Sequence, residues 1–325
     1  MITYRLGVDD LADMRFACSP ILETVTSLWA LTAPSAHVLH LPWIRQTNEL
    51  LANWPDRDLL MALVSPELHW LPDFLTPRPT SPLPDVRDEL AQLRGTPPRQ
   101  AVADVLRAYD GRPLPPILAD LTPRRLRDRV CTAVAAYWEL AIEPHWHRMR
   151  ALLEADMIHR AQLLARDGAA AVLTGLDPSV EWSNGELRMP ISSYELTYES
   201  EISGRGLWLV PTLFAKHPIA PLAPDEPPTV AYPARGVGTL WETRAAPTRQ
   251  ALADLLGAPR AELLIALDSP TSTIELARLR NVSPSAISQH LATLHANGLV
   301  ARARAGRVVL YTRTELADRL IHNRL

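Results

Sequence analysis

Residues 272–298 read STIELARLRNVSPSAISQHLATLHANG, and this stretch decides the fold of the C-terminal part of the chain. Ser272, followed three residues later by Glu275, fits a reciprocal capping box and predicts the start of a helix. That helix is short, because Asn-Val-Ser forms a polar turn after it. Ser283 can then cap a second helix with Pro284 in its first position, where a missing N–H costs nothing. The stretch therefore predicts two short helices joined by a tight turn.

The second helix has one apolar side and a clear end. Ile287, Leu291 and Leu294 recur at i, i+4 and i+7, which is the spacing of a buried helical stripe. Asn297 and Gly298 offer a left-handed stop. A short helix, a tight turn and a second helix with small polar residues outside are typical of a helix-turn-helix. This pattern predicts that the chain binds double-stranded DNA.

A hairpin is predicted directly after the second helix. Residues 299–304 and 308–312 read as two strands around a glycine turn. Arg302 and Arg304 are two residues apart, so they share one face of a strand, and Arg307 lies at the tip of the turn. The hairpin would be a wing that places cations where a phosphate backbone runs.

Two further helices flank this motif. Residues 260–268 read as a leading helix, and residues 314–325 read as a final amphipathic helix whose apolar side carries Leu316, Leu320 and Ile321. The order helix, helix-turn-helix, wing and helix over residues 247–325 resembles the winged-helix domain of ArsR-type bacterial transcriptional regulators. The run 283–291 is similar to the recognition helix of that family, and residues 298–300 resemble its lead into the wing.

The spacing within the second helix assigns roles to its side chains. Ser285, Ser288 and Gln289 point outward, whereas His290 shares the apolar face and packs inward or at its boundary. A glutamine suits the N6 and N7 atoms of adenine, and serine suits base edges or phosphates. The predicted DNA-binding residues are Ser283, Ser285, Ser288, Gln289, Arg302, Arg304 and Arg307. The alternative is a solvated polar surface on a helical hairpin that binds nothing.

Charge is distributed unevenly along the chain of 325 residues, whose net charge is −3. Residues 260–325 contain nine Arg and five acidic residues, giving +4, so the remainder carries −7. This asymmetry favours a DNA-binding end attached to a part with another role. Cys18 and Cys131 form no paired motif. The N-terminus has no basic-then-apolar leader, and no run approaches the ~20 apolar residues of a membrane span. We expect a cytoplasmic protein with no membrane partner.

The longer N-terminal part reads as helical first and β-containing later. Helical patterns cover residues 11–17, 20–31, 36–54, 99–109 and 123–167, with an irregular proline-rich crossing at residues 71–85. Strand patterns cover residues 186–191, 194–200, 206–214 and 229–232, with turns at Asn184-Gly185 and Gly204–Gly206. The predicted fold class is mainly α (α+β). The predicted domains are residues 1–245, helical over 1–170 and β-containing over 171–245, and the winged helix-turn-helix, 246–325, after a linker near Ala245-Ala246-Pro247.

The N-terminal part also resembles known domains, but this resemblance implies no chemical activity. It is similar to uncharacterised domains found ahead of ArsR-type helix-turn-helix domains in some regulators of GC-rich bacteria. The similar stretches are Arg15–Pro20, Pro144-His145-Trp146, Arg205-Gly206-Leu207 and Pro233–Gly238. The resemblance implies an architecture and no ligand or activity.

Metal and cofactor sites are not expected. A zinc site needs three or four convergent ligands, and the thiol site of many ArsR-type proteins has no counterpart because residues 272–280 lack Cys and His. Asp318 and His322 supply two ligands on the last helix. A second set of ligand-type side chains is Glu143, His145, His147, Asp156 and His159. A metal-responsive repressor therefore remains an alternative.

The sequence as a whole predicts a sequence-specific transcriptional regulator that works as a homodimer. Two recognition helices related by a twofold axis would read half-sites about 34 Å apart. Residues 1–245 would mediate dimerisation or bind an organic effector, because their tryptophans and apolar residues can line a pocket, although most of these are expected in the core. The alternative from another class is an enzyme whose winged helix mediates protein contacts.

Overall fold

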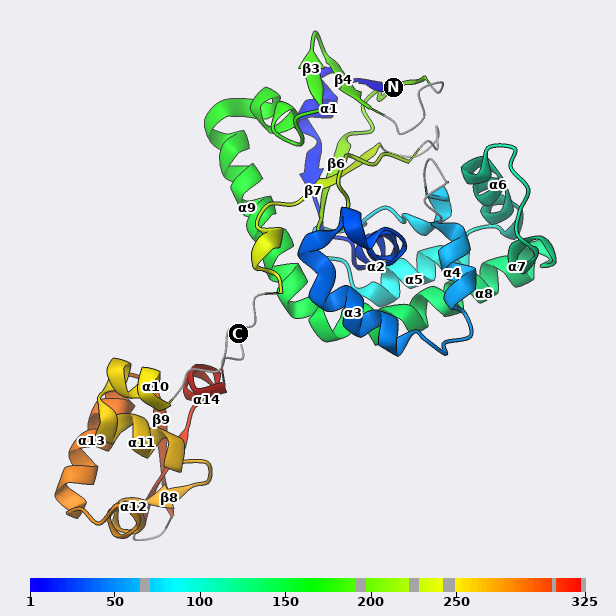
Figure 1. Cartoon of the computed structure of the whole chain (residues 1–325). Helices are drawn as coiled ribbons and strands as arrows, with labels where there is room; N and C mark the ends of the chain where they lie inside the picture. The colour runs from blue at the N-terminus through cyan, green and yellow to red at the C-terminus, as the bar shows by residue number, and fades with distance from the viewer. Residues whose placement is uncertain (65–70, 191–196, 222–227, 242–248, 306–307, 323–325) are drawn as a thin grey trace. The chain divides into compact units, whose positions relative to one another are not determined.

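The computed structural model describes residues 1–64, 71–190, 197–221, 228–241, 249–305 and 308–322 (Figure 1). Contacts within the chain divide it into two units, Met1–Trp241 and Glu242–Leu325. The predicted linker at residues 245–247 lies outside the described residues. Each unit has its own apolar core.

The first unit is organised around α2 (Pro20–Thr32), a helix that is buried along almost its whole length. Ser19 caps it by accepting the Leu22 N–H, and Pro20 occupies its first turn. The hydroxyls of Thr24 and Thr26 each donate to a carbonyl one turn earlier at 2.7 Å. These bonds satisfy the polar groups that a helix surrounded on all sides must bury.

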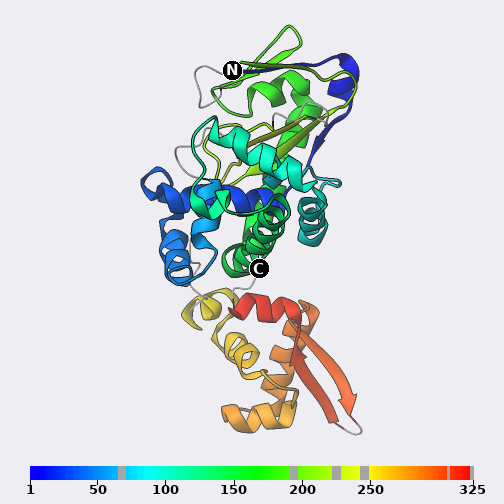
Figure 2. The same ribbon diagram turned by 90° about the vertical axis from the view of Figure 1, so that its right-hand side faces the viewer.

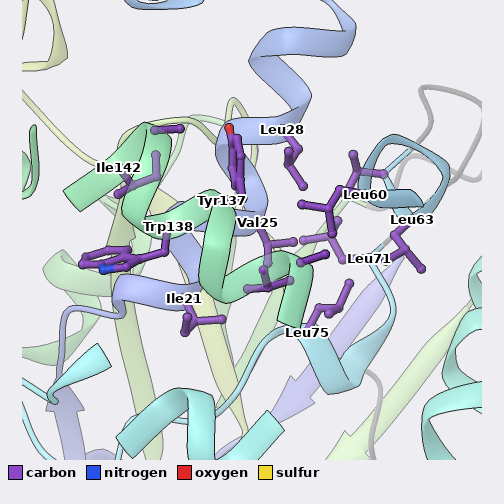
Figure 3. Packing of buried hydrophobic residues seen from close by; sticks show 14 of the residues in the cluster. Ile21, Val25, Leu28, Leu60, Leu63, Leu71, Leu75, Tyr137, Trp138 and Ile142 are labelled. Atoms are coloured by element: carbon purple, nitrogen blue, oxygen red, sulfur yellow. The ribbon is translucent and has the colours of Figure 1, made fainter. Parts of the chain in front are cut away.

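Further helices pack around α2, and Figure 3 shows the contact. Ile21, Val25 and Leu28 of α2 meet Tyr137 and Trp138 in the largest apolar core. The helices of this unit besides α2 are α1 (Val8–Ala12), α3 (Leu41–Leu50), α4 (Arg57–Leu63), α5 (Val86–Gly95), α6 (Pro98–Tyr109), α7 (Pro116–Ala119), α8 (Pro123–Tyr137) and α9 (Glu143–Thr174). A π-helical segment, Trp138–Ile142, joins α8 to α9.

Two small sheets complete the described part of the first unit. One has the order β3-β4-β1-β5, in which β1 is antiparallel to β4 and parallel to β5. The other has the order β2-β6-β7 and is parallel throughout. Their strands are β1 (Ile2–Arg5), β2 (Met14–Phe16), β3 (Glu181–Ser183), β4 (Glu186–Met189), β5 (Tyr198–Glu201), β6 (Leu207–Thr212) and β7 (Thr229–Pro233). The predicted turn between β3 and β4 is confirmed, because Asn184 and Gly185 both have positive φ angles, 52° and 78°.

Helix α9 connects the helical part to the sheets (Figure 1). Met149 and Leu153 near its start lie in the core around α2, whereas Val172 and Leu173 near its end lie in the core beneath the sheets. The helix is kinked at Gly168, whose φ of 82° lies in the left-handed region. One element therefore contributes to both cores of this unit.

The structure corrects several predictions about the N-terminal part. The expected helix at 11–17 is instead the end of α1 followed by strand β2, which pairs with β6. A short apolar run is compatible with both a helix and a strand. Here the pairing with a distant strand selects the extended conformation. The interpretation of residues 1–170 as helical is wrong for β1 and β2. The expected helix at 36–54 is confined to α3, preceded by two short 3₁₀ turns.

Other predictions for this part are confirmed, and one falls partly outside the described residues. The helix predicted at 20–31 is α2, and that at 99–109 is α6. The predicted strand at 194–200 lies partly outside the described residues, and β5 occupies its described end. Helix α9 continues to Thr174, beyond the point at which the sequence pattern predicts a change to strands.

The second unit is a small α+β fold. Its elements are α10 (Arg249–Leu256), α11 (Ala258–Ala266), β8 (Thr271–Ser272), α12 (Thr273–Arg280), α13 (Pro284–Ala296), β9 (Val300–Ala305), β10 (Val308–Arg313) and α14 (Glu315–His322). Its described strands form an antiparallel sheet with the order β8-β10-β9. Together, the two units confirm the α+β fold class.

One prediction about the last helix is wrong. Leu316 was expected on the apolar side of α14, but it is 56% exposed. The buried side is instead centred on Ala317, which is fully buried, with Leu320 and Ile321 packed partly against the core. The buried stripe of α14 consists of residues 317, 320 and 321, which have i, i+3 and i+4 spacing. It therefore begins one residue later than the predicted stripe, which began at Leu316.

Candidate nucleic-acid interface

The start of α12 and the turn after it form as the sequence predicts. Ser272 accepts the Glu275 N–H at 3.3 Å, and Glu275 accepts the Ser272 N–H at 2.9 Å, which completes the capping box. The hydrogen bond from the Ser272 backbone holds the pKa of Glu275 below its usual value. Asn281 ends the helix in a left-handed conformation with a φ of 54°. The chain can therefore turn sharply into α13.

Helix α13 is fixed at both ends by local interactions. Ser283 Oγ accepts the Ala286 N–H at 3.3 Å, with Pro284 in the first turn. At the other end, the Leu299 N–H bonds to the Leu294 carbonyl at 2.9 Å, and Gly298 has a φ of +70°. This pairing is the hydrogen bond of a Schellman motif, which requires the left-handed glycine. The orientation of α13 is thus set by residues within its own sequence neighbourhood.

The cap leads to a stability prediction. Ser283→Ala removes the side-chain acceptor for the Ala286 N–H, so we expect the second unit to lose about 1 kcal/mol of unfolding free energy. Differential scanning calorimetry can measure this loss through the transition of the second unit. Ser288→Ala, at an exposed position inside the same helix, is the control and should change stability much less. Equal effects of the two substitutions would show that Ser283 does not act as a cap.

The side chains of α13 separate into two faces. Ile287, Leu291 and Leu294 are at most 2% exposed and lie in the core of the second unit. The opposite positions, Ser285, Ser288 and Gln289, are exposed. His290 is half-buried at the boundary between the faces, one of the two positions that the sequence predicts for it. The outward positions are spaced i, i+3 and i+4, so they share one helical face.

The hairpin after α13 carries the predicted cations. β9 and β10 pair with Arg302 opposite Tyr311 and Arg304 opposite Val309, and both arginines are exposed. Figure 2 shows this hairpin as two long strands in the second unit. Arg307, which the sequence predicts at the tip of the turn, lies outside the described residues. By contrast, Arg313 at the end of β10 pairs with Asp318 at 2.8 Å and anchors α14.

The structure adds two features that the sequence analysis missed. Strand β8 pairs with β10 and joins the start of α12 to the wing. Arg278 is exposed in the last turn of α12, beside the turn into α13, while the neighbouring Arg280 pairs with Glu262 at 2.9 Å. In the sequence, the two arginines just before the polar turn could have indicated an additional cation at this position.

Comparison with known proteins decides what this arrangement is. Residues 260–302, which contain α12, the turn and α13, match the family described as bacterial regulatory protein, arsR family. The second unit carries an ArsR-family regulatory domain. Residues 117–238 of the first unit match a family of unknown function (DUF5937). No curated protein and no solved structure matches the chain. The ArsR-family domain makes this protein a DNA-binding transcriptional regulator.

Metal ligands do not converge in the part of the chain that the structure describes, either in the ArsR-family domain or before it. No group of three or more His, Cys, Asp or Glu side chains there could hold a metal ion. Asp156 instead accepts from the Tyr232 hydroxyl at 2.9 Å and the Arg235 N–H at 3.1 Å, and His159 contacts the Arg235 side chain. The His322 side chain lies outside the described residues. None of the described helices has the length and apolar character needed to cross a membrane.

Proposed function

We propose that this protein is a cytoplasmic, sequence-specific transcriptional regulator that binds DNA as a homodimer and responds to an organic effector. The observation that carries the proposal is the division of α13 into a buried apolar face and an exposed face of small polar residues. An exposed helix face with hydrogen-bonding side chains is what readout in the major groove requires. Ser283, Ser285, Ser288 and Gln289 are the proposed contacts on this helix.

The wing supplies the second part of the proposed interface. The exposed side chains of Arg302 and Arg304, with Arg307 between the strands in sequence, would bind phosphates or the minor groove. Phosphate contacts position a protein on DNA and supply most of its non-specific affinity, whereas base contacts supply specificity. Two copies related by a twofold axis would place their recognition helices about 34 Å apart.

A substitution at Gln289 tests the proposed readout. Gln289→Ala should lose about 1–3 kcal/mol of binding free energy at one operator position and relax the preference there, because a bidentate adenine contact disappears. The operator can be found by sequencing DNA that co-purifies with the full chain, and affinities can be measured by fluorescence anisotropy on operator and scrambled DNA. Gln162→Ala, at an exposed position on α9, is the control. An unchanged ratio of operator to scrambled affinity in Gln289→Ala would refute the assignment of this face.

An enzyme in the first unit has less support. A pocket on the parallel sheet, between α2 and two proline-containing segments, is lined by no ionisable side chain among the described residues. Glu23 and Glu89 have raised pKa values, but both are fully buried and accept backbone N–H groups. Buried carboxyls that hold the backbone have a structural role, and general acid–base catalysis needs groups within reach of a substrate.

A further inference from the structure

Trp241 is the last residue of the first unit, and its side chain is held by a cluster of aromatic rings. The indole ring is half-buried and stacks on the Trp43 ring, with centroids 6.0 Å apart and planes 18° apart. Its Nε1–H donates to His40 Nδ1 at 2.9 Å. His145, at the start of α9, lies nearly perpendicular to the same ring with centroids 5.3 Å apart. His40, Trp43 and His145 thus form the Trp241 seat.

The walls of the Trp241 seat are fixed by contacts that do not involve Trp241. Trp43 is 1% exposed, and its Nε1–H donates to a carbonyl of the π-helical segment at 2.9 Å. His40 Nε2 lies 3.0 Å from the Leu213 carbonyl, and the His40 ring stacks on Phe214 at a centroid distance of 4.4 Å. Departure of the Trp241 ring therefore leaves a preformed site the size of an indole. Preformed walls keep the entropy cost of binding low.

The hydrogen bonds of His40 set the polarity of the seat. A neutral imidazole has one N–H donor and one acceptor nitrogen. Because a carbonyl faces Nε2, that nitrogen carries the proton and Nδ1 is left as the acceptor. Burial lowers the pKa of His40 to about 4, against an opposing effect of the hydrogen bond with Leu213, and the neighbouring His37 lowers it further. The ring is therefore neutral at physiological pH, and the seat requires a donor from the molecule that fills it.

We propose that the Trp241 seat is an effector site for a planar heteroaromatic molecule with an N–H donor, of the indole class, and that the Trp241 side chain is its internal competitor. The ring that fills the seat in this structure shows which chemistry the seat accepts. It presents a flat bicyclic surface to Trp43 and one N–H to His40. A ring without this donor would leave His40 Nδ1 without its hydrogen bond, which is unfavourable for a buried acceptor.

Occupation of the seat by a free molecule displaces the last residue of the first unit. Trp241 directly precedes the ArsR-family unit in the chain, so its side chain fixes the point at which the chain leaves the first unit. A ligand that binds only when this ring is out of the seat favours the released state. Its apparent affinity is reduced by the fraction of molecules in which the seat is open. The regulatory step rests on the proposed response to an organic effector, whereas occupation of the seat does not.

Two probes of equal shape test the seat on the full chain. Indole carries the N–H donor, and benzofuran has an oxygen in its place. Trp241→Ala opens the seat, and isothermal titration calorimetry should show saturable binding of indole to this variant, with benzofuran bound about three- to tenfold more weakly through the missing hydrogen bond. A tethered ring competes at an effective concentration on the order of millimolar, so the wild type should bind indole at least about tenfold more weakly than Trp241→Ala. Trp208→Ala, at another half-buried tryptophan of the first unit, is the control and should behave like the wild type.

A second measurement follows Trp241 in the wild type and does not need Trp241→Ala to fold. In a chain labelled with ¹⁵N-tryptophan, the NMR signal of the Trp241 Nε1–H is assigned by its loss in Trp241→Phe. Excess indole should move this signal toward the position of a solvent-exposed indole, because the hydrogen bond to His40 is lost. Benzofuran at the same concentration should move it less.

The outcomes separate the ligand site from the regulatory function. If folded Trp241→Ala binds no indole, or if the wild-type Trp241 signal stays in place in excess indole, the seat is only part of the core and the proposal is wrong. Equal affinities of Trp241→Ala for indole and benzofuran would remove His40 as the polar anchor and overturn the ligand class. Indole should alter operator affinity in the wild type and not in Trp241→Ala. An unaltered wild-type affinity would overturn the effector role alone, whereas a wild type that binds no operator without indole would contradict the proposed DNA binding.

Discussion

A variant with alanine at Arg302, Arg304 and Arg307 is expected to lose about three units from the slope of log K against log salt, counted per protomer. Each phosphate that a cation neutralises releases about 0.9 counterion from B-DNA. Operator and scrambled DNA should be weakened to a similar extent, because phosphates carry no sequence information. Fluorescence anisotropy at salt concentrations from about 50 to 200 mM measures both effects.

The control for this variant removes the same charge elsewhere. Arg45, Arg99 and Arg125 are exposed on helices of the first unit, and replacing them with alanine changes the net charge of the chain equally. Their loss should leave the salt slope unaltered if the wing makes the phosphate contacts. A wing variant with the slope and affinity of the wild type would remove the hairpin from the DNA interface.

The C-terminal unit could be predicted in detail because its determinants are local. The caps at Ser272 and Ser283 and the glycine stop at Gly298 each involve partners within a few residues, and all three are confirmed. Strand β8 was missed because its partners, Leu310 and Tyr311, lie far along the chain. The division of α13 into two faces followed from its apolar spacing alone.

The first unit could be predicted only in part, because distant segments decide its structure. β1 and β2, within the first sixteen residues, pair with strands from residue 186 onward. An isolated stretch of three or four residues carries no information about such partners. The pocket was beyond prediction for the same reason: Leu22, Thr76 and Thr229 meet only in the folded chain. The tryptophan-rich composition was compatible with a pocket, but most of these residues were expected in the core, and Trp43 and Trp138 do lie there.

The same long-range packing buries two carboxyl groups that look unremarkable in the sequence. Glu23 of α2 is fully buried and accepts the Leu213 N–H with both oxygens, at 3.0 and 3.2 Å. Burial raises its pKa to about 8, against a smaller opposing effect of hydrogen bonds from Thr212 and Leu213. Glu89 of α5 accepts the Ile21 N–H at 2.8 Å, and burial raises its pKa to about 8 as well. Both groups therefore hold a proton at neutral pH in the folded state.

These carboxyls make the stability of the first unit depend on pH. In the unfolded chain they titrate near 4.5, so between about pH 4.5 and 8 the folded state binds more protons than the unfolded state. Their contribution to stability is fully present below about pH 4.5 and is lost as the pH rises through 8. The free energy of unfolding of the first unit should therefore fall as the pH rises across this range.

Glu23→Gln is expected to flatten this dependence, because glutamine keeps a neutral acceptor for the Leu213 N–H and does not titrate. Urea unfolding between about pH 4.5 and 8 measures it, and tryptophan emission reports the first unit alone because all nine tryptophans lie within residues 1–241. The variant should gain stability relative to the wild type as the pH rises. Glu139→Gln, at an exposed position, is the control and should retain the wild-type dependence. If the free energy of unfolding depends on pH in the same way in Glu23→Gln and the wild type, Glu23 is already ionised in the folded protein. The long-range contact between α2 and the end of β6 would then be held by a buried charge.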